Sequence, residues 1–224
     1  MQAPHSGDWL QALPITACGL RLDDEAIRVA VGLRVGAPLC TPHPCNCGIL
    51  LDARGSHALA CKKGGGRQTR HAQLNDCIYR ALIRSGRPAI KEPTGLLRSD
   101  GKRPDGSTSL AWDEGKCLAW DVTAPDTLAI SYQNICSVDA GAAAERASML
   151  KNRKYEDIKR THLFCPIAVE TMGPINKEGS DFIRLLGHRI SEMSGDKRET
   201  AFLFQRISVV MQRCNSICLH DCCM

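Results

Sequence analysis

The fold is decided by residues 103–123, whose sequence is RPDGSTSLAWDEGKCLAWDVT. Two apolar segments, 107–112 and 117–123, lie on either side of a turn-forming run and predict two antiparallel strands. Asp105 stands before the first segment and Asp121 in the second, with fifteen residues between them. Because a short turn joins the strands, we expect the two carboxylates to lie side by side.

Two converging carboxylates repel each other unless a cation lies between them. Mg²⁺ prefers oxygen ligands and keeps several waters, one of which can attack a phosphodiester. The pattern therefore predicts that Asp105 and Asp121 hold Mg²⁺, or Mn²⁺, at a hydrolytic site, with Glu92 as a third oxygen ligand. The alternative is that Asp105 caps a turn and Asp121 ends a strand without further function.

A lysine near the attacking water would complete such a site. Lys151 and Lys154 are one turn apart in a predicted helix, so they share a face. Tyr155 follows them and is expected to point at the phosphate. In the alternative interpretation both lysines lie in solvent.

The spacing of apolar residues outside this stretch predicts alternating helices and strands. Pro166 inside the last predicted strand indicates an edge position or a local kink. The resulting order, a helix, a three-strand meander, a helix, a strand and two helices, favours a mixed α/β fold. The expected helices cover residues 25–35, 67–85, 139–160, 177–193 and 197–213. The expected strands cover residues 95–98, 107–112, 117–123 and 163–171.

A Cys/His-rich segment, residues 38–66, ends in three glycines. Its candidate metal ligands, spaced C-x-C-x9-H-x3-C, are Cys45, Cys47, His57 and Cys61. Zinc favours such a set in a closed tetrahedral, structural site. Since two cysteines one residue apart strain a shared chelate, Cys40 or His43 can replace one of them. The alternative is a group of buried thiols beside a surface histidine.

The net charge of +5 is unevenly distributed. Residues 62–103 contain eleven Lys or Arg and three acids, so this block carries +8 and the rest of the chain −3. A basic block in a mildly acidic chain suits a polyanion-binding surface, although a solvated face is the alternative. The start of the helix at residue 67 adds backbone N–H groups that favour phosphate. The candidate nucleic-acid contacts are Arg67, Arg70, His71, Arg98, Lys102, Arg103 and Tyr155.

Composition excludes several classes of protein. With 43 % apolar and 24 % charged residues, the 224-residue chain is not wholly disordered. No apolar run approaches the 18 residues of a membrane helix. We expect no signal peptide and, for thirteen cysteines, reduced thiols in the nucleus or cytoplasm rather than secretion.

We therefore expect four parts. Residues 1–37 form a helical lead-in, residues 38–66 a zinc knuckle and residues 67–213 the α/β domain. Residues 214–224 contain Cys214, Cys218, Cys222 and Cys223 and are interpreted as a frayed Cys-rich tail.

Several segments together carry a resemblance that extends from Trp9 to Arg213. They are CNCG, GSHALAC, GRQTRHAQLND, EPTGLLRSDGKRPDGST, LAWDVTAPDTLAISY, KNRKY, FCPIAVETMG and FLFQRISVVMQR. In this order they resemble the C-terminal region of reverse transcriptases from animal non-LTR retrotransposons, which carries a Cys/His knuckle and a restriction-enzyme-like endonuclease.

The resemblance implies a PD-(D/E)xK nuclease fold, a mixed sheet of about four strands flanked by helices, that nicks target DNA. Asp105 and Asp121 match its two acids. Thr123 stands where the simplest motif has its lysine, so the resemblance assigns that role to Lys151 or Lys154. It also assigns the zinc to the knuckle cysteines and histidine.

The 224 residues contain no polymerase motif, so the resemblance covers a fragment, a decayed copy or a domesticated piece of an element. The expected partners are DNA, element RNA and a polymerase half that is encoded elsewhere or lost, with no membrane. Three functions stay open: a metal-dependent endonuclease, an inactive nucleic-acid-binding remnant, and a zinc-stabilised interaction protein. The basic block disfavours the third.

Overall fold

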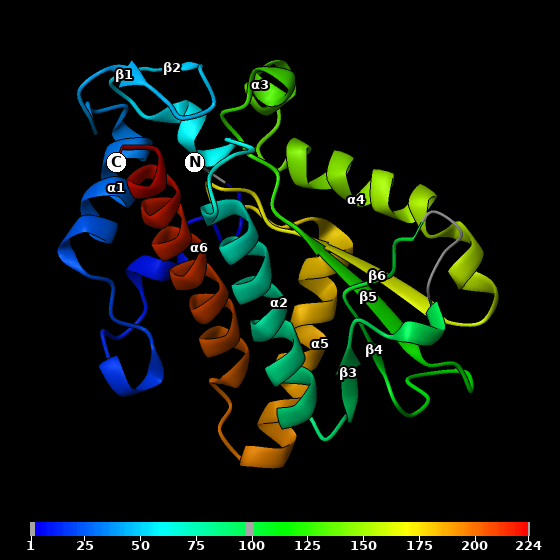
Figure 1. Cartoon of the computed structure of the whole chain (residues 1–224). Coiled ribbons are helices and arrows are strands. Elements are labelled where there is room, and N and C mark those ends of the chain that lie inside the picture. Colours follow the sequence, from blue (N-terminus) through cyan, green and yellow to red (C-terminus); the bar gives the residue numbers. More distant parts are fainter. Residues whose placement is uncertain (1–2, 97–100, 224) are drawn as a thin grey trace.

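The computed structural model describes residues 3–96 and 101–223, which form an α/β fold with six α-helices, a mixed four-strand sheet and a two-strand ribbon (Figure 1). The helices are α1 (Asp24–Val35), α2 (Gly66–Arg84), α3 (Ile130–Cys136), α4 (Ala142–Lys154), α5 (Lys177–Ser194) and α6 (Glu199–Cys223). The strands are β1 (His43–Pro44), β2 (Leu50–Leu51), β3 (Ala89–Lys91), β4 (Gly106–Thr108), β5 (Leu118–Thr123) and β6 (Leu163–Ala168).

The four-strand sheet has the order β3-β4-β5-β6. The pairs β3/β4 and β4/β5 are antiparallel and β5/β6 is parallel. The β4/β5 register pairs Gly106 with Trp120, so continuing it by one residue sets Asp105 opposite Asp121. Residues directly opposite in an antiparallel pair point to the same face. Pro166 lies in β6, which is an edge strand as predicted.

Helices cover both faces of this sheet (Figure 1). On one face α2 and α5 contact the strands, α6 packs across both helices, and Trp120 is completely buried among them. On the other face α4 lies against β6, where Ala144 and Ala147 contact Ala168. These small side chains let the helix backbone approach the sheet closely.

Most predicted elements are confirmed within a few residues. The predicted helix 139–160 is shorter, because α4 ends before the buried Tyr155 and a 3-10 turn, Glu156–Arg160, follows it. The sequence pattern did not predict α3, nor did it predict β3, which pairs with β4. Of the predicted strand 95–98, residues 95 and 96 are in a 3-10 turn and the rest lies outside the described residues.

The prediction of a frayed tail from residue 214 is wrong for residues 214–223. They continue α6, and Cys214, Cys218 and Cys222 are buried. Their small apolar thiols face α1, α2 and the knuckle, so the segment is the core of the contact between the knuckle and the α/β domain.

No helix in the described part of the chain has the length and apolar character that crossing a membrane requires.

Candidate functional site

Asp105 and Asp121 lie at the end of the sheet where β4 begins and β5 nears its end. Asp105 Oδ2 accepts a hydrogen bond from the Val122 backbone N–H at 2.6 Å, which fixes the carboxylate beside β5. Gly106 is required here because a Cβ at this position would overlap the Trp120 indole. With the register of β4 and β5, the hydrogen bond to Val122 places the Asp105 carboxylate next to Asp121.

Lys151 on α4 forms an ion pair with Asp121 Oδ1. The Asp121 side chain is only 4 % exposed, and burial, followed by the charge of Asp105, raises the pKa of its carboxyl group. The charge of Lys151, followed by its hydrogen bond, acts in the opposite direction, as does the nearby Tyr155 hydroxyl. Of the two candidate lysines, the structure thus brings Lys151 to the carboxylates, whereas the Lys154 Nζ donates to the Tyr155 hydroxyl at 2.7 Å.

His71 on α2 joins the carboxylate pair from the opposite side. Its Nε2 lies 3.0 Å from Asp105 Oδ2, and this hydrogen bond raises the pKa of the imidazole against the opposing effect of burial. The sequence pattern predicted a nucleic-acid contact for His71. The structure shows that His71 is also a partner of the first acid, and it places the imidazole at the edge of the cavity described below.

Tyr155 does not point outward at a phosphate, and that prediction is wrong. The side chain is completely buried, with its ring 4.9 Å from that of Phe164. Its hydroxyl donates to the Arg103 carbonyl oxygen at 2.8 Å. Because Arg103 is two residues before Asp105, Tyr155 holds the segment that leads into the first acid.

Glu92 and Arg103, predicted as a metal ligand and a nucleic-acid contact, form an ion pair with each other. The Glu92 side chain is 65 % exposed, and its backbone N–H donates to the Asp105 carbonyl oxygen at 2.9 Å. The main chain of Glu92 is thus next to the first acid, while its carboxylate has a guanidinium partner. Nothing in this arrangement assigns Glu92 to a metal.

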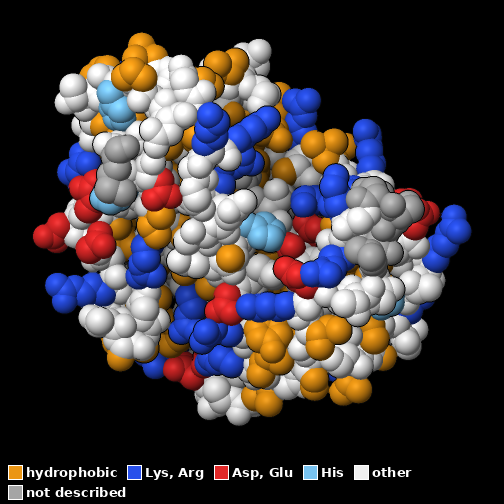
Figure 2. Space-filling view, viewed as in Figure 1, with side chains coloured by type: hydrophobic (Ala, Val, Ile, Leu, Met, Phe, Trp, Pro, Cys, Tyr) orange, Lys and Arg blue, Asp and Glu red, His pale blue; other side chains and the backbone are white. Residues whose placement is uncertain are grey.

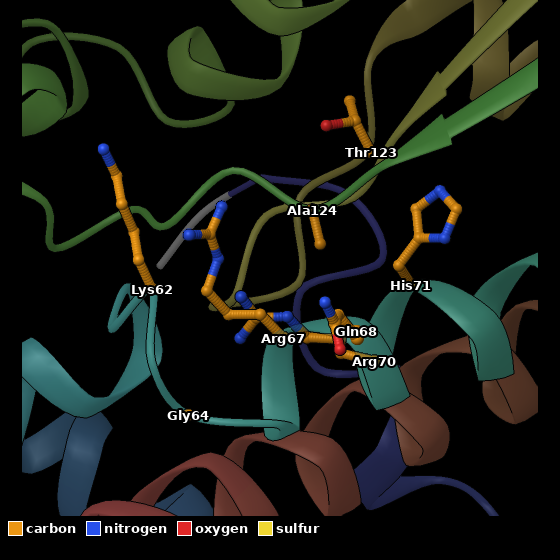
Figure 3. Close-up of a pocket in the computed structure, with 8 residues that line it drawn as sticks. All are labelled: Lys62, Gly64, Arg67, Gln68, Arg70, His71, Thr123 and Ala124. Carbon is orange, nitrogen blue, oxygen red and sulfur yellow. The ribbon is translucent and has the colours of Figure 1, made fainter. Parts of the chain in front are cut away.

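A basic cavity of about 400 Å³ lies between the knuckle, the start of α2 and the end of β5 (Figure 3). Lys62 lies at one end, His71 at the other, and Arg67 beside Lys62. Thr123 from β5 forms part of the opposite wall. A second cavity of about 350 Å³ shares several of these residues and extends to Lys151. Figure 2 shows Lys and Arg side chains gathered over the start of α2 and beside α4.

Arg70 is not placed for the predicted phosphate contact, because it is 99 % buried. Its guanidinium donates to the Leu59 carbonyl oxygen at 2.9 Å and to Asn215 Oδ1 at 3.2 Å. It therefore joins the knuckle and α6 to α2. Lys102 is exposed. Arg98, the remaining predicted contact, lies outside the described residues.

The four predicted knuckle ligands gather as expected. All ligand atoms lie within 4.8 Å of one another, and they belong to Cys45, Cys47, His57 and Cys61. The Sγ atoms of Cys45 and Cys61 are 3.6 Å apart, and Cys47 Sγ lies 3.0 Å from His57 Nε2. This is a donor set that can hold zinc in a tetrahedral site.

The Cys61 thiol is suited to metal binding. Burial opposes its ionisation, but backbone hydrogen bonds from Lys63 and Gly64, with the thiols of Cys45 and Cys47, lower its pKa to about 6. A thiolate near neutral pH is the form that binds a metal.

Neither alternative ligand occupies a place in this set. The Cys40 thiol donates to the Asp52 carbonyl oxygen at 3.2 Å. His43 Nδ1 lies 2.8 Å from the Thr41 carbonyl oxygen and Nε2 2.8 Å from that of Cys222.

Sequence reasoning missed two residues that shape the site. Asn75 on α2 accepts from the Trp120 indole N–H at 2.8 Å, which fixes β5 next to Asp121. Lys62 lines both basic cavities. The sequence signal for Lys62 was its position directly after Cys61, because a metal ligand fixes the main chain of the residue next to it.

No model of a known protein family matches the chain, and no curated protein sequence matches it.

Proposed function

We propose that the chain is a metal-dependent DNA endonuclease domain derived from a retrotransposon. The observation that carries the proposal is the position of Asp105, directly before β4, beside Asp121 of the neighbouring strand β5, with Lys151 paired to the second acid. Two carboxylates and a lysine are the groups that phosphodiester hydrolysis by this kind of site needs.

The fold is consistent with a restriction-endonuclease-like core. The expected order of elements is a helix, three strands, a helix and a strand, and it corresponds to α2, β3-β4-β5, α4 and β6. Helices cover both faces of the mixed sheet. The knuckle precedes this core, in the order that the resemblance to retrotransposon reverse transcriptases implies.

The donor set suits Mg²⁺ or Mn²⁺, because two like-charged carboxylates in a buried position form an oxygen-rich site. Asp105 and Asp121 would hold the ion, which supplies an activated water and stabilises negative charge at phosphorus. Lys151 would orient the water or the phosphate through its ammonium group. His71 keeps the Asp105 carboxylate in place.

The basic cavity would receive the DNA backbone beside this site. Lys62 and Arg67 lie at the end of the cavity away from His71, so they would contact phosphates next to the one that is cleaved (Figure 3). Such contacts position the substrate without reading its sequence.

A nicking assay tests the proposal: purified full chain, supercoiled plasmid and Mg²⁺ or Mn²⁺. We expect metal-dependent nicking that falls at least about 100-fold in Asp105→Ala, Asp121→Ala and Lys151→Ala. The matched control is Asp157→Asn, an acid whose side chain is 83 % exposed. Equal loss in the control, or nicking that survives in both aspartate variants, would contradict the proposal.

A second candidate is an inactive nucleic-acid-binding remnant that keeps the fold and the knuckle. One observation favours it: Lys151 already neutralises Asp121, an arrangement that is stable without a divalent ion. Salt-sensitive binding of DNA or element RNA in a gel shift, without nicking, would support this function instead.

A further inference from the structure

The second cavity, which extends to Lys151, differs from the basic cavity in composition. Its volume is about 350 Å³, and Lys151, the lysine that pairs with Asp121, forms part of its wall. The other walls come from the loop after β5, from α3 and α4, and from the start of α2. Ligand pockets in proteins measure about 300–1,000 Å³, so a small ligand group fits here. The contact with Lys151 places that group next to the two candidate catalytic acids.

The rim of this cavity is positively charged. Lys62 and Arg67 line it, are exposed and lie beside each other (Figure 3). Within the part of the chain that the structure describes, neither side chain forms an ion pair with an acid. Two cations that lack acidic partners favour a phosphate group at the rim, because hydrogen bonds between ionised groups are the strong ones.

One side of the cavity is apolar. Ala129 and Ala147 line it together with Leu150, which is 53 % exposed and would bury apolar surface against a ligand. Tyr132 adds an aromatic ring. Arg146 Cζ lies 5.8 Å from the centre of that ring, a contact that ties α3 to α4. A phosphate gains nothing from these side chains, whereas the flat face of a nucleobase stacks on an aromatic ring.

A base inside a duplex cannot make these contacts. Its two faces are covered by the neighbouring bases and its edge by its partner, so a group that enters a pocket must first leave the stack. A phosphate at the rim and an apolar side with an aromatic ring therefore match a nucleotide whose base is unpaired.

We propose that this cavity binds one unpaired nucleotide of the substrate strand, next to the phosphate that is cleaved. Lys62 and Arg67 bind its phosphate, and Tyr132 and Leu150 contact its base. The place of this nucleotide beside a cleaved phosphate rests on the proposed endonuclease function, and it makes unpaired DNA the substrate class of the site. Because every base has a face that stacks, the cavity selects an unpaired strand and not a sequence.

Two probes with the same number of phosphates test the inference. One is a fluorescein-labelled thymine pentanucleotide, and the other is the same chain with five abasic residues. Fluorescence anisotropy measures their binding to the full chain without added Mg²⁺ or Mn²⁺, so that no hydrolysis occurs. The wild-type chain should bind the thymine probe at least about 10-fold more tightly, because only this probe has bases that stack.

Two variants locate the base in the cavity. Tyr132→Ala should weaken binding of the thymine probe about 5-fold or more, and Leu150→Ala about 3-fold, with the abasic probe unchanged. The matched controls are Asn134→Ala and Met149→Ala, which alter exposed neighbours on α3 and α4 that are not part of the cavity wall. Both controls should bind the two probes as the wild-type chain does.

The inference is overturned if the wild-type chain binds both probes equally, or if Tyr132→Ala and Leu150→Ala behave like their controls. Neither result changes the outcome of the plasmid nicking assay, so nicking without any preference for the thymine probe leaves the endonuclease proposal in place. Base-dependent binding that both variants weaken, in a chain that does not nick, supports the nucleotide cavity and contradicts the endonuclease function.

Discussion

Lys151→Met removes the ammonium that neutralises a buried carboxylate and keeps most of the aliphatic stem. Deleting one partner of a buried ion pair costs about 3–5 kcal/mol of folding free energy. The Lys151 side chain is 23 % exposed, so water screens part of the charge and we expect about 2–3 kcal/mol. For a chain of this length that lowers Tm by about 5–10 °C.

The loss should depend on pH in a defined direction. Burial and Asp105 already raise the pKa of the Asp121 carboxyl group in the fold, and removal of Lys151 raises it further. An acid with a raised pKa destabilises the fold once it ionises, so stability falls as pH rises through that pKa. The deficit of Lys151→Met should therefore be largest at pH 7 and shrink as the pH is lowered.

Urea unfolding at pH 7 and pH 5 measures both effects. Lys177→Met is the matched control, since it removes an ammonium from an ion pair in which the lysine side chain is 83 % exposed. Adding Asp121→Asn to Lys151→Met should recover most of the lost stability, because the uncompensated charge is gone. If Lys151→Met unfolds at the same urea concentration as Lys177→Met, or if Asp121→Asn recovers nothing, the ion pair does not stabilise the fold.

Three further predictions follow from individual contacts. The hydrogen bond to Asp105 raises the pKa of His71 above 6.5, and this pKa should fall below 6.5 in Asp105→Asn, where burial remains without the carboxylate. NMR titration of the imidazole measures the change. An unchanged pKa would show that His71 and Asp105 do not interact. Since that pKa is raised, the pair stabilises the fold below pH 6.5, and this contribution disappears as pH rises through the raised value. Gly106→Ala should abolish nicking and lower Tm by several degrees, because the added Cβ forces β4 away from Trp120. Nicking at the wild-type rate would mean that β4 shifts without disturbing Asp105. Chelation should increase amide exchange over residues 38–66, and exchange that stays unchanged would argue against a structural metal.

The sequence predicted the parts of the fold that carry strong periodicity. β5 reads as an apolar strand because its side chains are buried on both faces, and α2 and α5 each show one apolar face. β3 has only three residues, two of them exposed, so its pattern is too short to detect. Its position follows from pairing with β4, which is tertiary information.

The candidate site was predicted to a similar extent and for similar reasons. The opposition of Asp105 and Asp121 follows from one hairpin, so local sequence was sufficient. The choice of Lys151 over Lys154 depends on how α4 is rotated against the sheet, which spacing along the helix does not determine. Arg70 and Tyr155 were misassigned because burial, and not residue type, decides whether a polar side chain serves substrate or structure.

The position of α6 affects how the chain folds during synthesis. This helix is the last described element to leave the ribosome, yet it contacts α1, α2, α5 and the knuckle. Until it emerges, those segments lack the surface on which they pack, and their apolar residues are exposed to chaperones. We therefore expect α1, α2, α5 and the knuckle to gain resistance to protease only once α6 is present, because these are the segments that pack on it.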